Sequence, residues 1–129
     1  MSYYFSKTIK DTSFEKAIEK TTSALKDEGF GILTEIDIKS TMKEKLDEEY
    51  NNYKILGACN PPFAHKALQA ESKIGTMLPC NVIVRENEDK SIEVAAVDPV
   101  ASMMGVANEN LAQIADEVRN KLKNAIESL

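Results

Sequence analysis

The chain has 129 residues, a net charge of −5 and a calculated isoelectric point near 5.0. Its 43% hydrophobic and 29% charged residues are typical of a soluble globular protein, and we expect one domain over residues 1–129. The acidic balance argues against nucleic acid as a partner, because nucleic-acid binding requires a basic stripe. No apolar stretch reaches the ~18–20 residues that span a bilayer, so we expect no membrane partner.

The N-terminal sequence MSYYFSKTIKD has the character of a strand and lacks the charged patch and apolar run of a signal peptide. We therefore expect a cytoplasmic location, where thiols are normally reduced. The two cysteines are then not presumed to form a structural disulfide.

The first half of the chain alternates between strand and helix patterns. Residues 3–9 and 31–37 are predicted strands, and the segment between them is a predicted amphipathic helix. Thr12 and Glu15 have capping-box spacing at its start, and Gly29 is a natural C-terminal cap. Asp37 is predicted to cap a short helix that follows the second strand.

The second half continues with a strand at 53–59, a helix beginning at Asn60 and extending to about Lys73, and strands at 80–86 and 92–98. Apolar residues at 3–4 spacing predict a long C-terminal helix over 108–129. This order predicts an α+β fold with helices on one face of a single sheet, which leaves the other face for water or a partner subunit.

Residues 55–84 contain Cys59, Cys80 and His65, the only cysteines and the only histidine of the chain. A helix between two strands of a sheet usually crosses back over the face, which makes those strands parallel. On that topology Cys59 and Cys80 lie at opposite ends of the sheet, too far apart for a disulfide or a shared metal within one subunit. A helix that does not cross the sheet, or pairing across a dimer interface, would bring them together. Zinc is also disfavoured by the ligand spacing.

Taken singly, Cys59 precedes a helix N-terminus and is either a reactive, ligand-contacting thiol or a small apolar strand residue. Cys80 has the same two interpretations. Asn60 is the expected helix cap, accepting a hydrogen bond from a backbone N–H. Asn81, early in a strand, would reach a loop or a ligand, and the helical angle of His65 predicts a surface position.

Glu71 falls within the apolar arc of the predicted helix, at about 80° from Phe63 at ~100° per residue. A carboxylate aimed at a core must be paired, hydrogen-bonded or neutralised. Glu71 is therefore either a structurally paired residue or a pocket carboxylate with a perturbed pKa.

Three segments, GFGILTEIDIKSTMKEKL, YKILGACNPPFAHKALQAESKIGTMLPCNVIV and VAAVDPVASM, resemble the domain of unknown function 302 family over residues 28–104. The resemblance implies a small α+β domain with a curved, mainly antiparallel sheet, similar to the TATA-binding-protein-like fold. It implies a homodimer and no established reaction. An antiparallel sheet would weaken the crossover argument above. The family pattern covers these residues without assigning them roles: Asp37, Cys59, Asn60, Pro61, Pro62, Glu71, Pro79, Cys80, Asn81, Asp98 and Pro99.

Asp98 before Pro99 favours an extended residue that caps a short helix. Met103 and Met104 would then follow, either as ordinary packing residues or at a pocket entrance or subunit contact.

No nucleotide-binding, hydrolase or metalloprotease motif is present, and no base is predicted close to Cys59. We therefore favour a small-ligand or metal-binding, sensing module over an enzyme, with cofactor and metal unspecified. Two alternatives stay open, a thiol-dependent redox protein or enzyme using Cys59 and a purely structural dimerisation domain. The candidate ligand-binding residues are Cys59, Asn60, Glu71, Cys80, Asn81 and Asp98.

Overall fold

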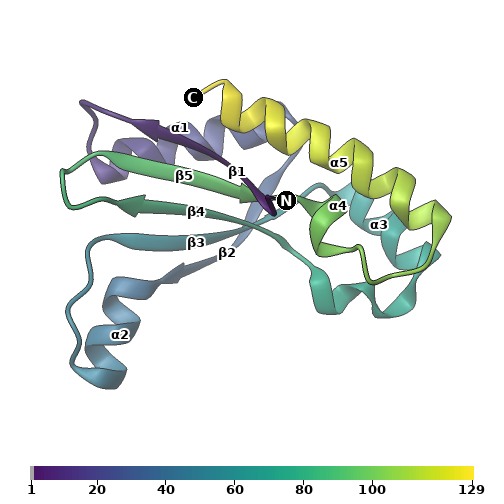
Figure 1. The fold of residues 1–129 in the computed structure, drawn as a ribbon, viewed down its shortest axis with the longest axis horizontal. Coiled ribbons are helices and arrows are strands. Elements are labelled where there is room, and N and C mark those ends of the chain that lie inside the picture. The colour runs from purple at the N-terminus through teal and green to yellow at the C-terminus, as the bar shows by residue number, and fades with distance from the viewer. Residues whose placement is uncertain (1) are drawn as a thin grey trace.

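The computed structural model describes residues 2–129 (Figure 1). Its elements in chain order are β1 (Tyr4–Ile9), α1 (Phe14–Asp27), β2 (Gly31–Asp37), α2 (Ile38–Leu46), β3 (Tyr53–Cys59), α3 (Pro61–Ala70), the 3₁₀ helix η1 (Ser72–Met77), β4 (Cys80–Glu86), β5 (Ile92–Val97), α4 (Pro99–Ser102) and α5 (Glu109–Glu127). No helix within residues 2–129 combines the length and the apolar character needed to cross a membrane.

The five strands form one sheet in the order β1-β5-β4-β3-β2. Every neighbouring pair is antiparallel. The predicted α+β class with a mainly antiparallel sheet and a long C-terminal helix is therefore confirmed. Figure 1 shows the C-terminal part of α5 near α1 and the strands, and the rest of α5 extending past the sheet towards α3 and α4.

The two faces of the sheet differ because side chains alternate along each strand. One face carries Leu56, Val82, Val84, Val94 and Ala96, which are buried against helices α1 and α5. The opposite face, here called the open face, carries the alternate positions of the same strands. It includes Ile55, Ile83 and Ala95, which are aligned across β3, β4 and β5.

Helix α1 begins and ends through local hydrogen bonds. Ser13, and not the expected Thr12, caps it by accepting from Lys16 N, so the predicted capping box is wrong by one residue. At the other end Gly29 has φ +88°, and Phe30 N–H donates to Leu25 O, as a Schellman-type ending requires. The predicted glycine cap is confirmed.

The connection from β3 to β4 differs most from expectation. Helix α3 ends at Ala70, where Asn108 Nδ2 donates to the Ala70 carbonyl at 2.9 Å. Glu71 is extended (φ −149°, ψ 106°), and η1 then returns the chain to the start of β4. The chain thus leaves and re-enters the sheet at the same end, and β3 pairs directly with β4. The expected parallel crossover, and the helix to Lys73, are wrong.

Candidate functional site

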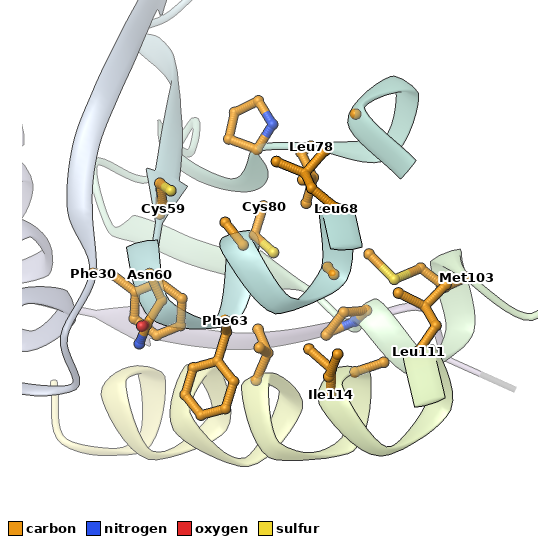
Figure 2. Close-up of a pocket in the computed structure, with 18 of the residues that line it drawn as sticks. Phe30, Cys59, Asn60, Phe63, Leu68, Leu78, Cys80, Met103, Leu111 and Ile114 are labelled. Atoms are coloured by element: carbon orange, nitrogen blue, oxygen red, sulfur yellow. The ribbon is translucent and has the colours of Figure 1, made fainter. Parts of the chain in front are cut away.

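A cavity of about 340 Å³ lies at the end of the sheet where β3 stops and β4 begins (Figure 2). The end of the sheet and the helices α3, η1, α4 and α5 enclose it. Its lining residues are Phe30, Leu33, Ala58, Cys59, Asn60, Phe63, Ala64, Ala67, Leu68, Gly75, Leu78, Pro79, Cys80, Pro99, Met103, Leu111, Ile114, Ala115 and Val118.

The cavity is unfilled because small side chains occupy the positions at which two helices face the sheet. Helix α3 presents Ala64 and Ala67, and α5 presents Ala115 between the larger Leu111 and Val118. Protein interiors are otherwise filled to crystal-like density, so a space of this size among ordered side chains is a distinctive feature. Its volume is about twice that of an engineered cavity of about 150 Å³ that takes up benzene.

Both cysteines line this cavity, contrary to the expectation that they would lie at opposite ends of the sheet. Ala58 is the register partner of Cys80, so Cys59 stands one residue further along the neighbouring strand. Cys80 is 8% exposed, and Cys59 is half-buried. Figure 2 shows the Cys80 sulfur among the apolar lining side chains.

The pKa of Cys80 indicates that the cavity wall around it is shielded from water. Burial raises the pKa of the Cys80 thiol from 9.0 to about 11, and the neighbouring Cys59 adds to the rise. Loss of water disfavours the charged form of a thiol, as it would the charged form of any group placed there. Cys80 is therefore an uncharged thiol at neutral pH, unsuited to nucleophilic attack.

Asn60 precedes helix α3 as predicted, but its side chain makes no capping bond. Its Nδ2 instead donates to the Glu28 carbonyl at 3.1 Å, at the end of α1. Gly29 leaves room for this amide, since a Cβ there would lie 3.0 Å from Asn60 Nδ2. Asn60 is 7% exposed and ties the wall of the cavity to α1.

The mouth of the cavity is apolar. A break in the β2–β3 register between Ile32 and Thr34 leaves Leu33 as an extra, bulged residue. Leu33 is 68% exposed and Leu68 of α3 is 45% exposed, yet both line the cavity. Exposed large apolar side chains beside an apolar cavity give it an entrance that does not repel an apolar molecule.

Gly57 holds this part of the sheet together. A Cβ at Gly57 would lie 2.1 Å from Thr34 Oγ1 and 2.7 Å from Pro79 Cγ. Only a glycine lets the strand after the bulge and the segment before β4 approach so closely. Gly57 thus positions both Leu33 and Cys80 through their chain neighbours.

The other candidate residues lie outside the cavity. Glu71 is partly buried at the break between α3 and η1, and its predicted place in an apolar helical arc is wrong because it is not helical. Asn81 is exposed, one position from Cys80 and therefore on the open face. His65 is on the surface, as predicted.

Asp98 has two bonds that account for its burial. Its Oδ1 accepts from Val100 N at 3.0 Å, which confirms the predicted cap, and its Oδ2 accepts from Arg119 Nε at 3.1 Å. Asp98 therefore joins the short helix α4 to α5. Met103 after it is buried in the cavity wall, whereas Met104 is exposed.

Within residues 2–129, no group of three or more His, Cys, Asp or Glu side chains is placed to hold a metal ion. Of the six candidate residues, the structure brings together Cys59, Asn60 and Cys80. Sequence reasoning missed the apolar majority of the lining, above all Phe63, Leu111 and Ile114. The available signal was the run of alanines on two helices that face one sheet.

Comparison with known proteins agrees with the fold. The crystal structure of an uncharacterized conserved protein DUF302 from Bacillus stearothermophilus superposes with a TM-score of 0.90, at 23% identity, over 98% of each chain. No curated protein sequence matches the chain. The sequence pattern of the family described as "Domain of unknown function DUF302" matches residues 5–129, which extends the resemblance well beyond residues 28–104. The chain therefore belongs to this family of unknown function.

Proposed function

We propose that this protein binds a small apolar molecule in the cavity between α3, α5 and the β3–β4 end of the sheet. The observation that carries the proposal is a cavity of about 340 Å³ whose lining is apolar apart from Asn60 and the two thiols. Concave, mostly apolar pockets of roughly 300–1,000 Å³ with a few polar groups are the usual form of small-molecule sites.

Three of the six candidate residues, Cys59, Asn60 and Cys80, have a place in this proposal. Glu71, Asn81 and Asp98 have none, because they do not line the cavity. A cytoplasmic location is part of the proposal, since a reducing compartment keeps both cysteines as the free thiols that line the wall.

The test is a titration with naphthalene, followed by NMR of leucine and isoleucine methyl groups. We expect shifts confined to the lining, with Leu68, Leu111 and Ile114 among the residues that move. Methyl shifts spread over the surface, or none at saturating naphthalene, would refute the proposal.

A matched pair of variants assigns the binding to the cavity. Gly75 lines the cavity, and a Cβ there would make only an ordinary contact, 3.9 Å from Leu68 Cδ2. Gly105 lies outside the cavity and a Cβ there meets nothing within 4 Å. We expect Gly75→Leu to narrow the cavity and weaken naphthalene binding at least tenfold, and Gly105→Leu to leave it unchanged.

We also propose that the chain forms a homodimer through the open face of the sheet. The support is a row of apolar side chains, Ile36, Ile55, Ile83 and Ala95, aligned across four strands on the face opposite the one packed against α1 and α5. A row of this kind is self-complementary about a two-fold axis, as an isologous interface requires.

Light scattering after gel filtration tests the dimer. We expect Ile83→Glu to yield monomers while Leu46→Glu, at an exposed position on α2 outside the row, leaves the dimer intact. A monomeric parent chain would refute this proposal without bearing on the cavity.

A further inference from the structure

The charge of the cavity wall limits what the cavity can hold. Among the lining residues there is no Asp, Glu, Lys, Arg or His. The polar groups are the amide of Asn60, already bonded to the Glu28 carbonyl, and the two thiols. A buried ion needs an opposite charge or several aligned donors, and the wall supplies neither.

We propose that the cavity selects an uncharged ligand, about a dozen heavy atoms in size and either aromatic or aliphatic, and excludes the ionised forms of carboxylic acids and amines. This inference rests on the proposed apolar-ligand function and deepens it by naming the ligand class.

Cys80 shows the effect of the wall on a charged group. Cys80 is buried in the wall without a hydrogen-bonding partner among the described residues, and burial, with a smaller contribution from Cys59, raises its pKa from 9.0 to about 11 and so disfavours the thiolate. A ligand carboxylate placed beside Cys80 meets the same loss of water. We therefore expect ionised ligands to bind at least tenfold more weakly than neutral ones of the same shape.

Two lysines beside a lining ring do not reverse this expectation. The Nζ atoms of Lys66 and Lys121 lie 5.5 and 6.0 Å from the centre of the Phe63 ring, but neither lysine lines the cavity. Neither ammonium group is therefore part of the cavity wall. Beside Pro99, the carboxylate of Asp98 is paired with Arg119.

The entrance agrees with an uncharged ligand. Leu33 and Leu68 line the cavity and are exposed, so the exposed part of the lining offers a polar molecule no polar side chain from these two residues. Natural proteins rarely leave large apolar side chains exposed together except at sites of interaction. The bulge that carries Leu33 is the kind of strand irregularity that re-aims a side chain near a functional site.

The experiment compares four naphthalene derivatives of equal ring size at pH 8: 2-naphthalenemethanol, methyl 2-naphthoate, 2-naphthoate and 2-naphthylmethylammonium. Naphthalene fluorescence reports binding directly, because the chain has no tryptophan. Each affinity is measured in the parent chain and in Gly75→Leu, so that only binding lost in the variant is assigned to the cavity.

We expect the alcohol and the ester to bind with similar affinity, and the carboxylate and the ammonium ion at least tenfold more weakly. A carboxylate that binds the cavity within threefold of its own methyl ester would overturn the inference and leave the apolar-ligand function standing. If none of the four compounds binds in a Gly75-dependent way, the proposed function itself fails. The two failures are therefore distinguishable.

A second pair of variants examines the entrance. Leu33→Glu places a negative charge at the mouth, and Leu46→Glu adds the same charge at a similarly exposed leucine, 65% exposed, on α2. We expect Leu33→Glu to lower the affinity for the neutral alcohol at least fivefold and Leu46→Glu to leave it unchanged. Equal affinities in the two variants would refute the inference that the ligand enters the cavity past Leu33.

Discussion

The buried thiol of Cys80 predicts a specific dependence of stability on pH. Its pKa is about 11 in the folded chain and 9.0 when exposed, chiefly because burial disfavours the thiolate. Above pH 9 the unfolded chain loses this proton while the folded chain keeps it, so rising pH favours unfolding. The stability contributed by the neutral thiol is fully present below pH 9 and is lost as the pH rises through about 11.

The magnitude follows from the two pKa values. A rise from 9.0 to about 11 is a hundredfold change in proton affinity, or about 3 kcal/mol in full, of which about 1 kcal/mol is lost by pH 10. Lysines and tyrosines also titrate in this range, so the quantity to measure is the difference between the parent chain and Cys80→Ala. The titration of the lysines and tyrosines cancels in that difference if the substitution does not affect it.

The assay is urea unfolding of both proteins at pH 8 and pH 10 under reducing conditions, with Cys59→Ala as a control. We expect the stability advantage of the parent over Cys80→Ala to shrink by about 1 kcal/mol between the two pH values. The Cys59→Ala control should keep most of this pH dependence of stability, because the charge of Cys59 is the smaller cause of the rise in the Cys80 pKa. A change below about 0.3 kcal/mol would mean that water reaches Cys80, which would contradict a cavity wall shielded from water.

Three further outcomes follow from the structure. Asp98→Ala removes both a helix cap and the bond to Arg119, and should lower the free energy of unfolding by about 2–4 kcal/mol. Asp98→Asn can keep the cap, and should lower the free energy of unfolding by about half as much. Gly57→Ala forces the added Cβ onto Thr34 and should cost about 1–3 kcal/mol, measured by urea unfolding; a neutral effect would contradict the close approach. In brief iodoacetamide labelling read by mass spectrometry, Cys59 should react and the buried cysteine should not, and 2-naphthalenemethanol should slow the reaction; equal labelling of both thiols would contradict the burial.

The parts of the fold that the sequence predicted are those governed by local chemistry. The caps at Asp37 and Asp98 and the glycine ending of α1 follow from side chains acting on neighbouring backbone groups, and they appear where expected. The amphipathic C-terminal helix follows from a spacing that only one secondary structure satisfies. Each of these features is fixed within a few residues of chain.

The parts that failed depend on distant contacts. The sequence predicts that Asn60 bonds within its own helix, but its side-chain amide donates instead to the Glu28 carbonyl at the end of α1. The sequence predicts that Asn81 reaches a loop or a ligand, whereas register with the neighbouring strands places it on the face opposite Cys80. Short-range sequence patterns carry no information on which distant carbonyl or which strand lies beside a given residue.

The position of the cavity follows from a single break in the chain. Had α3 continued past Ala70 and crossed the sheet, Cys59 and Cys80 would lie at opposite ends, as the unbroken helical pattern predicted. Asn108, from the loop before α5, caps α3 at the Ala70 carbonyl, and Glu71 takes an extended conformation there. The chain then doubles back through η1 and starts β4 beside the end of β3. The out-and-back path encloses a space that neither strand pairing nor helix packing fills. Glu71, which the sequence suggested as a buried carboxylate, thus affects the site through the turn of its backbone.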